Sequence, residues 1–135
     1  MRGVEHNGRE EPTLLELMLP LHGEFRRHLE QIRVTLLQAG VILFLGRHAD
    51  ARVKDAATAL RVRQPTMVEV VQDLVQKCWV TKRQSVQDRR AVSLRLSRRG
   101  LALAIQIVQR VRHVSTALTE HDRSALGLTP KSRRA

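Results

Sequence analysis

VKDAATALRVRQPTMVEVVQDLVQKCWVTKRQSVQDRRAVSLRLS, residues 53–97, contains two helix patterns and a hairpin pattern in close succession. The first helix pattern places apolar side chains at positions 53, 56, 57 and 60, which is helical spacing. A turn over residues 61–64 precedes Pro65, and the first turn of a helix accepts proline, so a second helix is expected over residues 65–78. A strand beginning at Val80 and the alternating stretch 92–97 then predict a hairpin closed by a basic loop.

This order of elements predicts a mainly α fold with a small β-hairpin wing, a winged helix-turn-helix over about residues 35–98. In that architecture the second helix, residues 65–78, enters the major groove of duplex DNA, and the charged wing, residues 83–91, lies beside it. Periodicity leaves the buried face of the second helix open. Either Met67, Val71 and Leu74 or Val68, Val71 and Val75 fit one face.

Helices are also expected on both sides of this segment, over residues 12–32 and 98–127, and the polar residues 1–11 are expected to form a flexible N-terminus. A chain of 135 residues suits one domain, so residues 12–135 are expected to fold as a single unit. The C-terminal part is expected to contain a long helix capped by Ser97 and a short last helix from Thr119. The long helix has one apolar face: Leu101, Ile105, Val108 and Val111.

The N-terminal helix carries conflicting signals. Residues 14–21 are so rich in apolar side chains that this helix needs partners on more than one side. Pro20 and Gly23 are expected to kink or interrupt it. Thr35 and Gln38 form a capping-box pair, which predicts that the next helix begins there.

The chain is strongly basic, with 24 Lys and Arg against 13 Asp and Glu, a formal net charge of +11 and a pI near 11.5. Such a balance is typical of nucleic-acid binding. Basic residues gather in or beside the two-helix and hairpin region: Arg61, Arg63, Lys82, Arg83, Arg89, Arg90, Arg95, Arg98 and Arg99. Aromatic residues make up only 2% of the chain, whereas proteins that bind RNA or single strands stack bases on aromatic side chains. The composition therefore favours duplex DNA as the partner.

Other function classes have little support in the sequence. We expect no enzymatic activity and no cofactor, because a glycine-rich phosphate loop, a nucleophile elbow and a paired-carboxylate motif are all absent. The six histidines show no zinc-ligand spacing, so no metal site is expected. Cys78, the single cysteine, fits a reducing compartment and is expected to be buried. A soluble cytoplasmic protein is expected, because no apolar run suits a membrane span or a secretory signal.

Three segments carry a family resemblance: TLLQAGVILFL (residues 35–45), DAATALRVRQPTMVEVVQDLVQKCWVTKR (residues 55–83) and QDRRAVSLRLSRRG (residues 87–100). Over residues 35–103 the chain resembles the multiple-antibiotic-resistance regulator (MarR) family of bacterial transcription factors. The most specific element is the Asp-Arg-Arg triplet, residues 88–90, at a fixed distance from the second helix and from the Leu-Ser-x-x-Gly segment.

The resemblance implies a homodimer held together by the helices near both termini, residues 12–32 and 98–127. Each subunit then presents one winged helix-turn-helix to a pseudo-palindromic operator. The resemblance also implies a repressor relieved by a small phenolic or lipophilic effector, bound in a cleft near His22 and His28. The alternative is a winged-helix DNA-binding protein without effector control, architectural or degenerate, because the expected last helix is short and few aromatic side chains are available to line a pocket.

The family pattern makes Met67, Val70, Val71 and Leu74 the buried side of the second helix. It directs five residues toward DNA: Arg63, Gln64, Thr66, Val68 and Glu69. Gln64 suits adenine, Arg63 suits guanine or a phosphate, and Thr66 suits a phosphate. Val68 and Glu69 depart from the polar and basic residues usual in the family. They suit a thymine methyl and a cytosine amine, although Glu69 alternatively pairs with a surface arginine.

In the hairpin the resemblance adds five expected DNA-binding residues: Lys82, Arg83, Asp88, Arg89 and Arg90. The Asp88 carboxylate is expected to hold an arginine so that the loop keeps its shape. Arg89 or Arg90 is expected to enter the minor groove, where a narrow groove has an enhanced negative potential. Cys78 occupies a position at the helix end where the family usually has glycine, and such a position favours a left-handed backbone.

Overall fold

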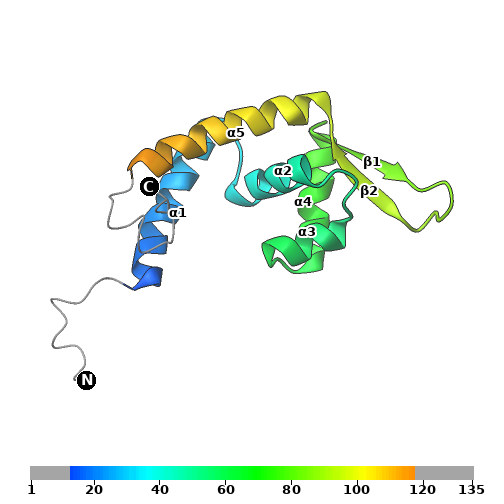
Figure 1. Ribbon diagram of the computed structural model, residues 1–135, viewed down its shortest axis with the longest axis horizontal. Helices are drawn as coiled ribbons and strands as arrows, with labels where there is room; N and C mark the ends of the chain where they lie inside the picture. Colours follow the sequence, from blue (N-terminus) through cyan, green and yellow to red (C-terminus); the bar gives the residue numbers. More distant parts are fainter. Residues whose placement is uncertain (1–12, 118–135) are drawn as a thin grey trace, which may run out of the picture.

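The computed structural model describes residues 13–117, and the last helix expected from Thr119 lies outside them. The described residues form five helices and one antiparallel two-stranded sheet (Figure 1): α1 (Leu14–Glu30), α2 (Leu36–Arg47), α3 (Val53–Leu60), α4 (Gln64–Gln76), β1 (Val80–Gln84), β2 (Val92–Leu96) and α5 (Arg98–Ala117). This order confirms the expected mainly α fold with a small β-hairpin wing. Within the described part of the chain, no helix is long and apolar enough to cross a membrane.

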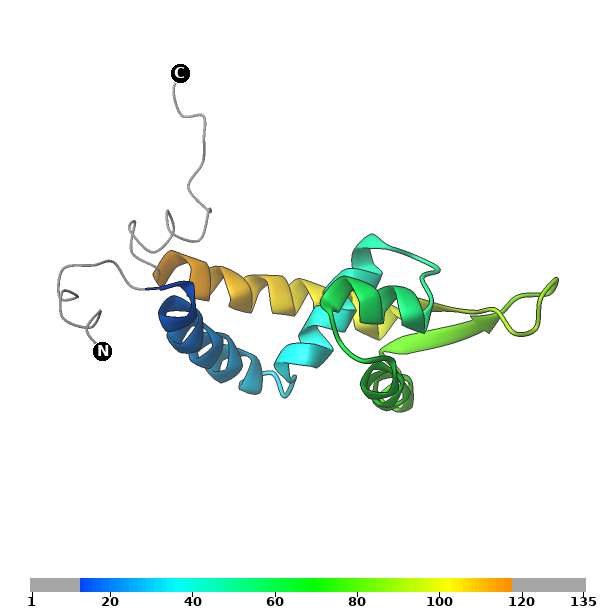
Figure 2. The same ribbon diagram turned by 90° about the horizontal axis from the view of Figure 1, so that it is seen from below.

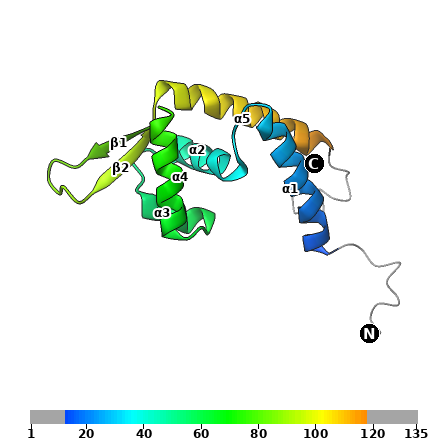
Figure 3. The same cartoon turned by 180° about the vertical axis from the view of Figure 1, so that it is seen from behind.

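The elements form two parts joined by α5. Figures 1 and 3 show α5 as a long helix with α1 beside its C-terminal half and with α2, α3, α4 and the hairpin near its N-terminal end. Figure 2 shows the hairpin extending away from α1. We call α2, α3, α4, β1 and β2 the winged lobe, and α1 with the C-terminal half of α5 the terminal lobe.

Both α1 and α2 begin with a capping box. At α2 the Thr35 hydroxyl accepts a hydrogen bond from the Gln38 backbone N–H (3.1 Å), and the Gln38 side chain accepts one from the Thr35 N–H (3.0 Å), as predicted. Thr13 and Glu16 make the same exchange at α1. The hydrogen bond from the Thr13 backbone lowers the pKa of the Glu16 carboxyl. Both helix starts are therefore fixed by local side chains.

Of the expected kink or interruption at Pro20 and Gly23, the interruption is wrong, because α1 runs unbroken through both residues. Proline removes one backbone hydrogen bond, and the turns on either side keep theirs. The carbonyl group left unpaired belongs to Glu16, four residues earlier, which is an exposed residue. The capping box fixes the first turn, and the buried Leu29 anchors the last turn against the core.

The core of the winged lobe lies between α2, α4, β2 and the inner face of α5. Its fully buried side chains include Ile42, Met67, Leu74, Leu94 and Ile107. The outer face of α5 is also apolar. Three members of the predicted face, Leu101, Ile105 and Val108, are exposed there, whereas the fourth, Val111, is half-buried against the core. A second exposed apolar group lies on α1: Leu14, Leu15, Met18 and Leu19. Within residues 13–117, two helices therefore have exposed apolar faces.

The start of α5 is fixed against the end of α4. The Ser97 hydroxyl accepts a hydrogen bond from the Gly100 N–H (3.0 Å) and donates one to the Cys78 carbonyl (2.6 Å), so Ser97 caps α5 as predicted. A Cβ atom at Gly100 would lie 2.0 Å from the Trp79 carbonyl oxygen, so only glycine fits this approach. These contacts hold α4, the hairpin and α5 as one unit.

Candidate nucleic-acid interface

The register of α4 follows the first of the two patterns that periodicity left open. Met67, Val71 and Leu74 are buried, and Val70 is half-buried. The residues predicted to face DNA all have exposed side chains and lie at or near the N-terminal end of α4: Arg63, Gln64, Thr66, Val68 and Glu69. Figure 3 shows α4 uncovered on the near side of the winged lobe, with the hairpin beside it.

The N-terminal end of α4 is open to an external partner. Arg63 is the N-cap residue, and its side chain makes no capping hydrogen bond. The first N–H groups of a helix have no acceptor within the helix, and the helix dipole adds partial positive charge there. An anion such as a DNA phosphate is therefore favoured at this end, beside Arg63, Gln64 and Thr66.

The turn between α3 and α4 occupies only residues 61–63. Arg61 adopts a left-handed backbone with φ 56°, and the Val62 N–H donates to the Ala57 carbonyl at 2.9 Å, which closes the end of α3. Arg61 and Arg63 are exposed on either side of the half-buried Val62. The turn therefore presents two cations next to the start of α4.

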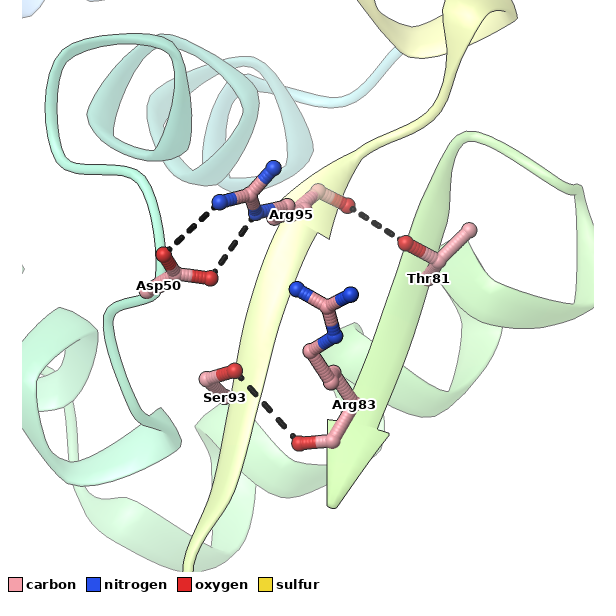
Figure 4. Close-up of polar contacts among 5 residues, drawn as sticks. All are labelled: Asp50, Thr81, Arg83, Ser93 and Arg95. Atoms are coloured by element: carbon pink, nitrogen blue, oxygen red, sulfur yellow. Dashed lines mark hydrogen bonds and ion pairs between the residues drawn. The ribbon is translucent and has the colours of Figure 1, made fainter. Parts of the chain in front are cut away.

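Side chains of the hairpin alternate between a buried face and an exposed face of the two-stranded sheet. β1 and β2 pair from Val80 opposite Leu96 to Gln84 opposite Val92. Val80 and Leu94 are buried on one face. The other face carries Thr81 and Arg83 of β1 with Ser93 and Arg95 of β2 (Figure 4). The two predicted cations of β1, Lys82 and Arg83, are both exposed.

The loop of the hairpin is held through its backbone. The Ser85 hydroxyl accepts hydrogen bonds from the N–H groups of Gln87 and Asp88, both at 3.2 Å. The Asp88 carboxylate accepts one from the Arg90 N–H at 3.0 Å, so its contact is with the main chain of Arg90. Because the loop is shaped this way, the side chains of Arg89 and Arg90 stay exposed and available to a partner.

A charged pair that the sequence analysis missed joins the hairpin to the α2–α3 connection. The Asp50 carboxylate accepts hydrogen bonds from Arg95 Nε at 2.8 Å and Arg95 Nη2 at 2.9 Å (Figure 4). The hydrogen bond from Arg95 lowers the pKa of the Asp50 carboxyl, to which Arg83 is also attracted, and Asp50 raises the pKa of Arg95. The two residues are 45 positions apart, so no local spacing signals their contact.

A cleft of about 330 Å³ lies where α1 approaches the start of α2 and the end of α4. Its charged lining is mostly basic: His22, Arg26, Arg33 and Lys77, against Glu30. Val34 and Leu36 add apolar wall. His22 therefore lines this cleft. His28 lies outside it, with its ring stacked 6.0 Å from that of His113 on α5.

Hydrogen-bonded side chains connect this cleft to α4. Lys77 Nζ lies 3.3 Å from the Asp73 carboxylate, which also accepts a 2.6 Å hydrogen bond from the Gln38 side chain. Gln38 is buried and belongs to the capping box of α2. An anion that binds Lys77 therefore competes with a carboxylate on the C-terminal half of α4.

Cys78 is exposed, so the expectation that it is buried is wrong. Its backbone is left-handed, with φ 64°, which agrees with the glycine usual in the family at this position. The chain reverses here between α4 and β1, and a side chain at such a reversal points away from the core. Among residues 13–117, no group of three or more His, Cys, Asp or Glu is placed to hold a metal ion.

Comparisons with known proteins agree with this geometry. Residues 34–91 match the model of the MarR family. None of the curated proteins is significantly similar to the sequence. Among solved structures, the chain is similar to BpsR of Bordetella bronchiseptica, whose DNA binding is regulated by 6-hydroxynicotinic acid, with a TM-score of 0.76 and 20% identity over 94% of this chain and 91% of that chain.

Two further structures show the same fold. The apo form of MarR from E. coli has a TM-score of 0.74 and 20% identity over 87% of this chain and 93% of that chain. The transcriptional repressor CouR, bound to a 23-mer DNA duplex, has a TM-score of 0.74 and 23% identity over 84% of this chain and 83% of that chain. The chain therefore has the fold of MarR-family transcription regulators.

Proposed function

We propose that this chain, which matches the MarR family model over residues 34–91, is a transcription regulator that binds double-stranded DNA as a homodimer. The observation that carries the proposal is the exposed N-terminal face of α4 beside a loop with two exposed arginines, Arg89 and Arg90. In this proposal α4 enters the major groove and the hairpin loop contacts the minor groove.

The charge distribution supports DNA as the partner. Arg61, Arg63 and Lys82 are exposed on the same lobe as Arg83 and the loop arginines. Cations that neutralise phosphates release condensed counterions, and this gain is independent of sequence. The net charge of +11 also attracts a polyanion from a distance.

Sequence preference is assigned to α4. Gln64 is proposed to read adenine, and Arg63 a guanine or a phosphate, because their side chains match those donor and acceptor patterns. Thr66 is proposed to hold a phosphate at the open helix end. Val68 is proposed to contact a thymine methyl group and Glu69 to accept from a cytosine amine.

The homodimer is proposed to form through α1 and α5, with the segments 12–32 and 98–127 as dimerisation helices. The exposed apolar groups on α1 and on the outer face of α5 support this assignment. Soluble monomers rarely keep contiguous apolar faces in water. A two-fold dimer then places two copies of α4 on the half-sites of a pseudo-palindromic operator.

We propose that the regulator is a repressor relieved by an effector in the basic cleft beside His22 and Lys77. The lining favours a small phenolic or lipophilic molecule that carries an acidic group, because cations surround an apolar wall. Binding to Lys77 would loosen its contact with Asp73 and so alter the position of α4. An effector shifts the population off DNA by no more than its differential affinity for the two states.

Fluorescence anisotropy with the DNA upstream of the protein's own gene tests the central proposal. Arg90→Ala is expected to weaken binding about tenfold and to lower the slope of log affinity against log salt by about 1. Arg27→Ala is the matched control, because Arg27 is an exposed arginine on α1 that pairs with Glu24 at 2.7 Å, and sedimentation checks that this variant remains a dimer. Binding that is absent or independent of salt contradicts the DNA proposal, and equal effects of the two variants contradict the assigned loop contact.

Thermal shift measurements with salicylate and related phenolic acids test the effector. A ligand that binds the native state raises the melting temperature, and the shift grows with the logarithm of the ligand concentration above Kd. Lys77→Gln is expected to remove that shift, whereas Lys54→Gln on α3 is expected to keep it. A DNA-binding protein that responds to none of these compounds favours the alternative without effector control.

A further inference from the structure

The connection between α2 and α3 contacts β2 at three points. The Asp50 N–H donates to the Leu94 carbonyl at 3.1 Å, and the Leu94 N–H donates to the Ala51 carbonyl at 2.8 Å, which pairs Ala51 with Leu94 as an antiparallel bridge. The third contact is the two-point pairing of Asp50 with Arg95. The hairpin is therefore tied to the helix-turn-helix at its outer edge as well as through the buried core.

The geometry of the Asp50–Arg95 pair indicates that it orients the two side chains more than it stabilises the fold. Both side chains are about half exposed, and exposed ion pairs contribute little to the free energy of unfolding. Two parallel hydrogen bonds between a guanidinium and a carboxylate nevertheless fix the direction of both groups. Asp50 also adopts a left-handed backbone with φ 66°, which aims its side chain across the hairpin edge.

Asp50 also lies close to a cation that the proposed function uses. Arg83 extends from β1 on the face that carries Arg95 (Figure 4), and its charge attracts the Asp50 carboxylate. Because Arg95 already occupies both carboxylate oxygens, the Asp50 charge is largely neutralised and Arg83 remains exposed. Without this pairing, a carboxylate on the basic lobe would repel phosphates.

We infer that Asp50 and Arg95 are positioning residues for the wing, which set the angle between the hairpin and α4 and so determine how well the protein distinguishes its operator from other duplexes. This inference rests on the proposed function. The pair touches no base in this assignment. It acts through Arg83 and the loop arginines, which reach the minor groove only while the hairpin keeps its angle.

The first test measures discrimination between two duplexes: one selected by the wild-type protein from a random pool, and a scrambled duplex of equal length. Asp50→Asn is expected to lower the affinity ratio of the two by about tenfold or more, because a misplaced wing loses its groove contact. Affinity for the scrambled duplex is expected to stay equal or to rise, because a negative charge is removed. Glu24→Gln removes the same charge from an arginine pair on α1, and it is expected to leave the ratio unchanged at protein concentrations where sedimentation shows the variant and the wild type to be dimers.

The second test needs no DNA. Residual dipolar couplings of the β1 and β2 amide groups, compared with those of α4, report the angle of the hairpin. The wild-type couplings are expected to fit one orientation, and those of Asp50→Asn to be reduced by averaging. Arg95→Lys is expected to behave like Asp50→Asn, because lysine keeps the charge and lacks the two-point fork.

The outcomes separate the two proposals. A wild-type protein that selects no duplex contradicts the proposed function, and the dipolar couplings still test the wing angle. The positioning role is contradicted if the wild-type protein selects a duplex and the Asp50→Asn variant shows the same affinity ratio and the same dipolar couplings as the wild type. If affinities for both duplexes fall together with the melting temperature, Asp50 is a structural residue and the inference is wrong.

Discussion

The uncovered apolar face of α1 leads to a quantitative prediction for the dimer. Leu15 is 66% exposed in the single chain, and it lies with Leu14, Met18 and Leu19 on a helix that the proposal places in the interface. Replacing Leu15 with glutamine removes an apolar side chain at nearly constant helix propensity, because both residues are good helix formers. The change therefore acts on association more than on α1 itself.

The size of the effect follows from the exposed fraction. Full burial of a leucine side chain contributes about 1.5–3 kcal/mol, so burying the exposed two thirds contributes about 1–2 kcal/mol per chain. A two-fold interface contains each residue twice, which gives about 2–4 kcal/mol per dimer. Since about 1.4 kcal/mol corresponds to a tenfold change, Leu15→Gln is expected to raise the dimer dissociation constant on the order of 30- to 700-fold.

Sedimentation velocity over a range of protein concentrations measures this dissociation constant. Val86→Gln is the matched control, because Val86 is 97% exposed at the tip of the hairpin, outside the proposed interface. It is expected to leave the dissociation constant unchanged. A wild-type protein that sediments as a monomer at micromolar concentration refutes the reasoning, and so does a Leu15→Gln dimer as tight as the wild type.

Two further predictions concern the packing of α5 and the pH dependence of the wing pair. Gly100→Ala is expected to lower the free energy of unfolding by about 3 kcal/mol, because its Cβ would lie 2.0 Å from the Trp79 carbonyl oxygen. Gly23→Ala is expected to raise the free energy of unfolding by about 0.5–1 kcal/mol, because a Cβ atom there meets nothing within 4 Å. Chemical denaturation measures both changes. The Asp50 carboxyl, followed by NMR, is expected to titrate below its ordinary value of about 3.9. Its pKa is expected to rise toward that value in Arg95→Gln, because the hydrogen bond from Arg95 is the largest cause of the lowered pKa. The contribution of the ionised Asp50 to the free energy of unfolding is therefore complete above the ordinary pKa, and it is lost as the pH falls through the lowered pKa. Equal titration midpoints of Asp50 in the wild type and in Arg95→Gln contradict the pairing.

Local signals in the sequence predicted the elements of the winged lobe well. The Thr35–Gln38 box and the Ser97 cap depend on residues within three positions of each other, and the structure contains both. The register of α4 is different, because its apolar stripe is wider than one face. Periodicity allowed two registers, and only the family pattern favoured the one that buries Met67 and Leu74. Which register is correct depends on where α2 and β2 lie.

The faces of α5 show why periodicity alone was insufficient. Apolar residues occupy both sides of this helix, so spacing identifies an apolar face without showing what covers it. Ile107 is buried because α2 and β2 lie on its side, whereas Ile105 is left exposed. The same limit applies to Pro20, whose effect depends on solvent access, and to Asp50 and Arg95, which only the tertiary fold brings together.

Under the proposed function, affinity and sequence preference come from different kinds of contact on the winged lobe. Phosphate contacts carry no sequence information, so an arginine such as Arg61 adds affinity on any duplex, whereas the loop arginines depend on the local width of the minor groove. Glu69 opposes that attraction, because a carboxylate near phosphates is repelled unless a donor such as a cytosine amine meets it. Its charge therefore lowers affinity for most sequences and spares those with a suitable base. Asp50 escapes this penalty because Arg95 neutralises its charge. Glu69, by contrast, is exposed near the N-terminal end of α4, where its charge disfavours sequences that offer it no hydrogen-bond donor.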